Sequence, residues 1–246
     1  MAQEVIPALA AGCCQIWWAC PSAARPPLLD LLDDGERRRH ARFVRGQDRA
    51  LFLVAHALTR ILAARHGGGE PRGVRFRPGA AGAKPRLGGA AAGLELSISH
   101  SGRRAVVALS RGVALGVDVE EVRRMGEDAS LAEAILARSE QRALAILGPA
   151  ERAWALSRWW TRKEAVLKAS GDGLAVSPKL IVVTPPTEPP ALAAGAGPRA
   201  VHLYDLDAGP GYTGALAAIR IPVALTEHDG SAILEAWDRA GARVGR

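Results

Sequence analysis

The sequence predicts an α+β fold made of two similar halves, in which antiparallel sheets pack against helices. Apolar residues recur every three or four positions in the longer segments and every second position in the shorter ones, which is typical of helices and of strands. Helical segments precede strand segments twice, and hairpin turns are indicated at 101–102 and 209–211. A chain of 246 residues has room for two such halves, which we place at 1–112 and 113–246.

The first half is predicted to begin with a strand over 15–19 and two helices over 28–43 and 47–66. In the second helix, apolar residues at three- and four-residue steps indicate a buried face, and the glycines at 67–69 end it. From Leu94 the apolar residues alternate with polar ones, which predicts an antiparallel meander. Its strands are expected over 94–98, 105–109 and 113–120.

The second half is predicted to contain helices first and strands afterwards. Pro149 favours the start of a long helix, because proline fits the first helical position. The expected helices cover 131–137, 139–147, 149–169 and, near the end of the chain, 231–240. The expected strands cover 180–183, 200–206 and 212–219. The proline-rich segment 185–190 indicates a surface loop.

The formal net charge of +7 indicates partners that carry negative charge. Basic residues are dispersed, with one run of three at 37–39, and no basic tail or aromatic-interleaved basic stripe typical of nucleic-acid modules is present. We therefore expect a polyphosphate compound or an acidic protein as the partner, and no nucleic acid.

The three cysteines indicate a reducing compartment. Cys13, Cys14 and Cys20 are odd in number and clustered, which fits neither a secreted disulfide framework nor a zinc site. The first residues lack the pattern of a signal peptide, and no apolar stretch reaches the length of about 18 residues that spans a membrane. We expect a cytoplasmic protein that does not insert into membranes.

A pair of carboxylates occupies one face of the strand predicted over 113–120. The period of two places Asp118 and Glu120 on the same face as the small residues Ala114 and Gly116. Two carboxylates side by side repel each other unless a cation or solvent relieves the repulsion. The pattern is therefore consistent with a cation site, and equally with an exposed strand face.

A third carboxylate lies within the apolar stripe of the helix predicted over 149–169. Glu164 follows Leu156 and Trp160 at four-residue steps, so a charge falls on the buried side unless something meets it. Lys168 could pair with it across one helical turn as a simple salt bridge. Alternatively, Glu164 joins the strand carboxylates around Mg²⁺, which prefers oxygen ligands, and Lys168 neutralises a phosphate oxygen.

The segment 97–102 collects donors suited to phosphate oxygens. It contains three serines and His100 at a strand end, followed by Arg103 and Arg104. A serine–histidine nucleophile pair is the rival interpretation, but no nucleophile elbow surrounds it. The chain also lacks a GxxxxGK(S/T) loop, a GxGxxG helix opening and the kinase HRD and DFG sequences, which argues against those classes.

Two of these segments together resemble the surfactin-synthetase-activating (Sfp-like) phosphopantetheinyl transferases. Residues 116–120, GVDVE, are similar to the family motif G-(I/V)-D-(I/V/L)-E. Residues 160–168, WTRKEAVLK, are similar to W-(S/T)-x-K-E-(A/S)-x-x-K. The two motifs occur in the family's order, and the resemblance continues over most of the chain.

The resemblance implies roles for individual residues. The implied Mg²⁺ ligands are Asp118, Glu120 and Glu164. The implied contacts with coenzyme A, which is a substrate, are Lys168 at the diphosphate, Lys84 and Pro85 beside the adenine, Ser99 and His100 at the phosphates, and Arg39 at the 3′-phosphate. Glu36 stands where a second basic residue is common, and Arg37 is a possible substitute.

The resemblance also implies an activity and an assembly. The expected reaction moves 4′-phosphopantetheine from coenzyme A to a serine of an apo acyl- or peptidyl-carrier protein, with Mg²⁺, and releases 3′,5′-ADP. Because Sfp-like members resemble two short synthase units fused in one chain, we expect a monomeric pseudodimer. Two alternatives stay open: a Mg²⁺-dependent phosphodiesterase or nucleotidase acting on coenzyme A-like substrates, and a non-enzymatic basic binding protein.

Overall fold

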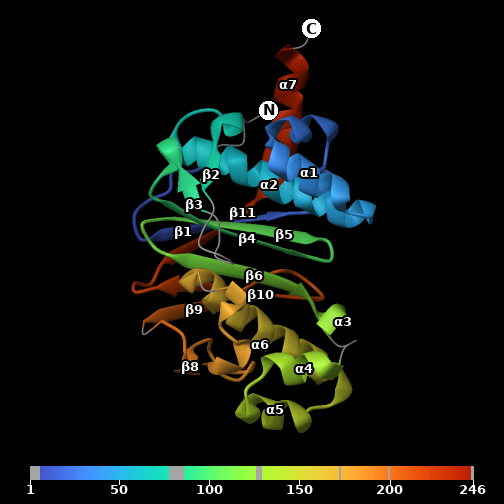
Figure 1. The fold of residues 1–246 in the computed structure, drawn as a ribbon, viewed down its shortest axis with the longest axis vertical. Coiled ribbons are helices and arrows are strands. Elements are labelled where there is room, and N and C mark those ends of the chain that lie inside the picture. The colour runs from blue at the N-terminus through green and yellow to red at the C-terminus, as the bar shows by residue number, and fades with distance from the viewer. Residues whose placement is uncertain (1–5, 78–85, 126–128, 172, 199, 245–246) are drawn as a thin grey trace. The chain divides into compact units, whose positions relative to one another are not determined.

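The computed structural model describes residues 6–77, 86–125, 129–171, 173–198 and 200–244. These residues form two compact units (Figure 1). The first unit takes in 6–77, 86–112 and 224–244, and the second takes in 113–223. Each unit contains helices and at least one sheet, so the predicted α+β fold class is confirmed.

The first unit has a four-stranded sheet in the order β11-β1-β5-β4. Its strands are β1 (Cys13–Ala19), β4 (Leu94–Ser101), β5 (Arg104–Arg111) and β11 (Ala224–Asp229). Its helices are α1 (Asp34–Arg42), α2 (Gly46–Gly67) and α7 (Gly230–Val244), and they gather on one face of the sheet (Figure 1). A small hairpin of β2 (Arg75–Arg77) and β3 (Arg86–Gly88) follows α2. Short 3₁₀ turns occur at η1 (Pro21–Ala23), η2 (Pro26–Leu31), η3 (Pro71–Gly73) and η4 (Gly89–Ala91).

The first unit closes with residues that the sequence assigned to the other half. The first unit includes 224–244 in addition to described residues before Val113, whereas we predicted one half over 113–246. The reason is that β11 pairs parallel with β1, and Ile233 and Leu234 of α7 are buried in the core of this unit. The sheet is therefore mixed rather than purely antiparallel.

Two further elements of the first unit differ from expectation. The predicted helix over 28–43 is broken, because Asp33 caps α1: its Oδ1 accepts from the Glu36 amide at 2.9 Å and its own amide donates to Glu36 Oε2 at 2.9 Å. The predicted meander is wrong in its strand order. β5 pairs with β4 along one edge and with β1 along the other, so neither edge is free to pair with the strand predicted over 113–120.

The second unit has a three-stranded antiparallel sheet in the order β6-β10-β9. Its strands are β6 (Leu115–Glu121), β9 (Val201–Leu206) and β10 (Tyr212–Ile219), with a separate pair of β7 (Ile181–Val183) and β8 (Leu192–Gly195). Its helices are α3 (Val122–Met125), α4 (Ala129–Ile135), α5 (Arg138–Ala145) and α6 (Pro149–Ser170), with 3₁₀ turns η5 (Gly173–Ala175) and η6 (Pro178–Leu180). The long helix α6 lies against this sheet, α4 and α5 lie on the side of α6 that faces away from the sheet, and α3 contacts both β6 and α6 (Figure 1).

Most predicted elements of the second unit agree with the structure to within two residues, and β10 agrees at both ends. Two strands were not predicted, β8 of this unit and β11 of the first unit. Both are short and largely exposed, and they therefore lack an apolar period. Within the described residues, no helix combines the length and the apolar character that crossing a bilayer requires.

Candidate active site

The candidate site of the second unit lies where β6 packs on α6. A Cβ atom added at Gly116 would overlap the Ala165 carbonyl oxygen and the Ala169 amide nitrogen, so the strand touches the helix backbone at this point. The face of β6 that carries Gly116, Asp118 and Glu120 is therefore turned toward α6. This arrangement rules out the alternative of an exposed strand face for Asp118, which is 3% exposed.

Asp118 and Lys168 form an ion pair across this contact. Lys168 Nζ lies 2.7 Å from Asp118 Oδ1 and also donates to the Val117 carbonyl at 3.1 Å. The ammonium is thus fixed by two groups of β6 in addition to its own helix. The sequence allowed Lys168 to be only the i+4 partner of Glu164, and the structure instead shows it bridging α6 to the strand.

Glu164 lies one helical turn before Lys168 and has a raised pKa. Burial and then the charge of Asp118 raise its pKa above the usual value, while the charge of Lys168 opposes the rise. Its Oε1 is buried, and no donor of the described residues hydrogen-bonds to it. A cation or a proton that reaches this oxygen would stabilise the carboxyl group.

Glu120 is held by a motif residue that the sequence did not assign. Trp160 Nε1 lies 3.4 Å from Glu120 Oε1, a long hydrogen bond that joins the end of β6 to α6. Trp160 precedes Glu164 by one turn, so one stretch of helix contacts the strand through Trp160 and Lys168. The sequence contained a signal for this contact, because the indole of Trp160 carries a hydrogen-bond donor as well as an apolar ring.

The donor chemistry of the cluster fits a hard divalent cation. Asp118, Glu120 and Glu164 offer carboxylate oxygens, which Mg²⁺ prefers, and the buried Oε1 of Glu164 has no donor. As placed, with Lys168 bonded to Asp118, no three His, Cys, Asp or Glu side chains in the described part of the chain are grouped closely enough to hold a metal. The arrangement therefore supplies carboxylate oxygens of the kind that Mg²⁺ prefers, and the Lys168 ammonium contacts one of them, on Asp118.

The predicted coenzyme A contacts of the first unit lie on two different elements. Ser99 and His100 are neighbours on β4, Ser99 nearly buried and His100 exposed. Arg39 is exposed on α1 with its guanidinium 6.0 Å from the centre of the Phe52 ring. Lys84 and Pro85 lie outside the described residues. The predicted hairpin turn after Ser101 is present, with Ser101 paired to Arg104.

Glu36 has a structural task that explains an acid at its position. It is 7% exposed, and its carboxylate contacts His56 Nδ1 at 2.8 Å and Arg60 Nε at 2.8 Å. Burial favours a higher pKa, but the hydrogen bonds from His56 and the Asp33 amide and the charges of His56 and Arg60 lower it below its usual range. Glu36 therefore ties α1 to α2 and is not oriented to meet a phosphate. Arg37, the possible substitute, donates to the Leu32 carbonyl at 3.1 Å.

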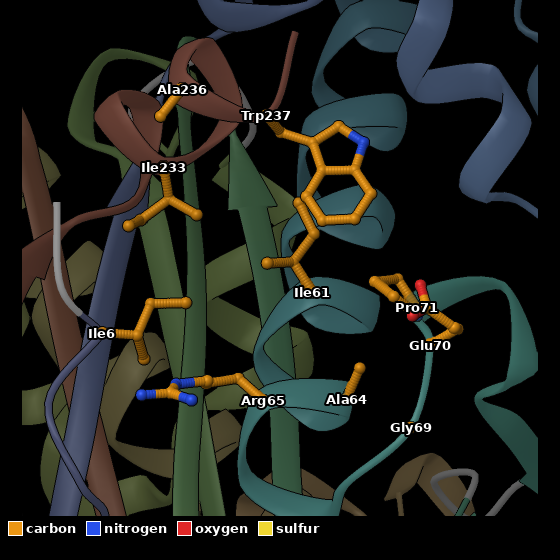
Figure 2. A pocket seen from close by; sticks show the side chains of 10 residues that line it. All are labelled: Ile6, Ile61, Ala64, Arg65, Gly69, Glu70, Pro71, Ile233, Ala236 and Trp237. Atoms are coloured by element: carbon orange, nitrogen blue, oxygen red, sulfur yellow. The ribbon is translucent and has the colours of Figure 1, made fainter. Parts of the chain in front are cut away.

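A separate cavity of about 390 Å³ lies in the first unit, and its lining includes no predicted site residue (Figure 2). It opens between α2, α7 and the segment before β1, and its wall is mainly apolar. The lining residues are Ile6, Ile61, Ala64, Arg65, Gly69, Glu70, Pro71, Ile233, Ala236 and Trp237. Trp237 and Ile61 face the cavity from opposite helices in Figure 2. The cavity contains none of the acids or serines discussed above.

Comparisons with known proteins agree with the resemblance of the motifs. Residues 114–217 match the family described as the 4′-phosphopantetheinyl transferase superfamily. The 4′-phosphopantetheinyl transferase HetI of Nostoc sp. is 32% identical over 174 residues, which cover 70% of this chain and 73% of that protein. A Synechocystis sp. protein with the name "Putative 4′-phosphopantetheinyl transferase slr0495" is 30% identical over 159 residues, which cover 64% of this chain and 65% of that protein.

A solved structure is also similar. The holo-(acyl-carrier-protein) synthase of Thermotoga maritima is 24% identical, with a TM-score of 0.36 over 44% of this chain and 63% of that chain. The matched region 114–217 contains Asp118, Glu120, Glu164 and Lys168, the cluster that β6 and α6 bring together. The identity and coverage of the Nostoc sp. relative, together with the match to the family model, show that the chain belongs to the 4′-phosphopantetheinyl transferase superfamily.

Proposed function

We propose that this enzyme transfers 4′-phosphopantetheine from coenzyme A to a serine hydroxyl of an apo acyl- or peptidyl-carrier protein and releases 3′,5′-ADP. The observation that carries the proposal is the cluster of Asp118, Glu164 and Lys168 between β6 and α6, within the segment that matches this superfamily. The relatives are named as transferases, which favours transfer over the hydrolytic alternative.

The chemistry divides among the residues of the cluster. The serine oxygen attacks the β-phosphorus of coenzyme A, and the bond to the α-phosphate oxygen breaks, so that 3′,5′-ADP leaves. Lys168 faces the charge that grows on the leaving group. We assign the serine proton to Glu164, because burial and Asp118 raise its pKa and so make its carboxylate a stronger base.

Asp118, Glu120 and Glu164 are the residues that would hold Mg²⁺. When bound, this ion supplies neutralisation of the diphosphate oxygens. The support is the donor set itself, with three carboxylates and a buried Glu164 oxygen that has no donor. Lys168 would then also donate to a phosphate oxygen, because its ammonium has three donors and can bond to Asp118 and to the phosphate at the same time.

The first unit is proposed to hold the nucleotide end of coenzyme A. Arg39 is the proposed contact of the 3′-phosphate, and Ser99 and His100 of the phosphates, with Lys84 and Pro85 beside the adenine. Exposure of the Arg39 side chain supports its role at the 3′-phosphate. The net charge of +7 favours an acidic carrier protein as the second substrate. The Sfp-like type, a monomer and a cytoplasmic location complete the proposal.

Intact-mass measurement of an apo carrier protein tests the function. We expect its mass to increase by one phosphopantetheine group after incubation with coenzyme A, Mg²⁺ and the enzyme. Asp118→Ala, Glu120→Ala and Glu164→Ala should each abolish the increase while circular dichroism shows a folded protein. Near-normal turnover at saturating Mg²⁺ in two of these variants would contradict the proposed metal ligands.

Two controls separate the alternatives. Without the carrier protein, coenzyme A should stay intact, whereas a phosphodiesterase would consume it at the same rate. Glu133→Ala, which removes an exposed acid of α4 in the same unit, should transfer at the wild-type rate. If neither transfer nor consumption occurs with any carrier protein, the basic binding protein is the better description.

A further inference from the structure

Three consecutive charged residues of α6 point to three different parts of the second unit. Successive residues of a helix are turned by about 100°, so Arg162, Lys163 and Glu164 cannot share one environment. Glu164 faces the β6 side, where Asp118 affects it. Arg162 and Lys163 are both fully buried, which is uncommon for these residue types and requires partners.

Lys163 meets a complete set of acceptors. Its Nζ lies 2.6 Å from Glu140 Oε2 and donates to the Pro178 carbonyl at 3.0 Å and to the Ile181 carbonyl at 2.5 Å. An ammonium has three donors, and these three oxygens account for all of them. Lys163 therefore holds α6 to η6 and to the start of β7.

Glu140 extends this connection to a second helix. Its Oε2 accepts from the Ala137 amide at 2.8 Å, at the beginning of α5, and its Oε1 accepts from the Val183 amide at 3.2 Å, at the end of β7. Glu140 is 4% exposed, so the pair is shielded from water. The two side chains thus join α5, β7 and α6 through one buried ion pair.

Arg162 makes an equivalent set of contacts on another side of α6. Its guanidinium donates to both oxygens of Asp205 on β9, at 2.9 and 2.7 Å. It also donates to the carbonyls of Thr184, Pro185 and Glu188, which follow β7. The loop after β7 and the strand β9 are therefore both fastened to α6 at this residue.

We infer that Lys163 and Arg162 are positioning residues, whose buried contacts set the rotation of α6 and so present Glu164 and Lys168 to β6. Apolar side chains allow small shifts at little cost, but a buried charge that loses its partners is strongly destabilised. A turn or slide of α6 would break contacts of both residues on two sides of the helix. Glu164, the next residue of α6, keeps a buried oxygen to which no described donor hydrogen-bonds, and this oxygen can take part in the reaction.

The kinetic test uses Lys163→Met, and this part rests on the proposed function. We expect kcat to fall by about tenfold or more while KM for coenzyme A changes less than twofold, because small misplacement of reacting groups slows the chemical step. The assay is run at a temperature at which circular dichroism shows the variant folded. Lys179→Met, a change of an exposed lysine on η6, is the matched control and should leave kcat unchanged.

A double variant covers the case in which Lys163→Met fails to fold. Glu140→Gln with Lys163→Met removes both charges and leaves no unpaired ion, so thermal stability should recover. On the positioning interpretation kcat stays low in the recovered protein. Recovery of kcat together with stability would overturn the inference, because the pair would then matter for stability alone.

A spectroscopic test is independent of activity. The chain has four lysines, so the side-chain signals of a ¹⁵N-lysine sample can be assigned by single substitutions. The hydrogen-bonded ammonium of Lys168 should give a distinct signal, and it should shift or disappear in Lys163→Met but not in Lys179→Met. An unchanged Lys168 signal would contradict the inference. If the wild type transfers nothing, the proposed function fails, and this spectrum still decides the positioning role.

Discussion

Lys168 places one positive charge beside a buried carboxylate, Asp118, and a half-buried one, Glu164, which come from different elements. Its ammonium is bonded to Asp118, and its charge lowers the pKa of Glu164 against the effects of burial and Asp118. We expect Lys168→Ala to lower kcat by about a hundredfold or more, because it removes an ammonium that stabilises the negative charge developing on the leaving group in the transition state. Steady-state kinetics with a carrier protein measure this.

The conservative variant and the melting temperature distinguish the roles of Lys168. Lys168→Arg should recover part of the rate, because a planar guanidinium does not replace a compact ammonium beside Asp118. If Lys168 were only the structural partner of Asp118, Lys168→Ala would leave kcat of the folded variant within about twofold and would lower the melting temperature, because Asp118 would be buried without its counter-charge.

Arg39 and His100 are exposed residues with a proposed task in coenzyme A binding. If they hold the 3′-phosphate, Arg39→Ala and His100→Ala should raise KM for coenzyme A more than for dephospho-coenzyme A, and added salt should weaken binding. Arg142→Ala, an exposed arginine of α5, serves as the control. Equal increases for both substrates would place these side chains elsewhere.

Glu36 links stability to pH in the first unit. Its pKa is lowered in the folded protein, so its stabilising contribution is present above the unfolded value of about 4.3 and is lost as pH falls through the folded pKa. Glu36→Gln removes one of the two carboxylates that pair with the buried Arg60, the other being Asp33, and should cost about 2 kcal/mol at pH 7. Urea unfolding should show this difference shrinking below pH 4. A difference that stays constant down to pH 2 would contradict the role of the charge.

At the scale of elements, the contact of β6 with α6 depends on the absence of a side chain at Gly116. Gly116→Ala places a methyl group against the backbone of Ala165 and Ala169, which cannot move without shifting the helix. We expect a loss of about 1–3 kcal/mol in stability together with reduced kcat, because the strand carrying Asp118 moves from Lys168. Thermal melting and kinetics measure the two effects.

The control for this substitution is Gly73→Ala at the end of η3. A Cβ atom there meets nothing within 4 Å, so stability and rate should stay near the wild type. Wild-type melting and kcat in Gly116→Ala would show that the helix yields and that the close approach is not needed.

Prediction of the elements from sequence depended on their length and burial. The period of 3.6 found α2 and α6, and the period of two found β4, β5, β6 and β10, because each has an apolar face against a core. The break between η2 and α1 was missed although Asp33 and Glu36 form a capping box, a pattern visible in the sequence. β11 gave no signal, since it is mostly exposed and is defined by pairing with a strand about two hundred residues earlier.

At the scale of the whole molecule, the end of the chain completes the first unit. β11 pairs with β1, and α7 packs against α2 and β1. Truncation before Ala224 should therefore reduce amide protection in β1 and β5 and leave that of β9 and β10 nearly unchanged, because local stability follows the lost contacts. Hydrogen exchange with mass spectrometry measures this. Loss of protection confined to β9 and β10 would contradict the division into units.

The sequence by itself determined the fold class and the longer elements, and it led us to propose four charged residues for the site, because periodicity and motif spacing are local properties. It placed Asp118 and Glu120 on one strand face and Glu164 in an apolar stripe. The tertiary structure alone decided that Lys168 pairs with Asp118, that Lys163 and Arg162 are satisfied internally, and that Glu36 serves α2. These outcomes depend on which distant groups reach a buried charge, and that follows from packing rather than from residue order.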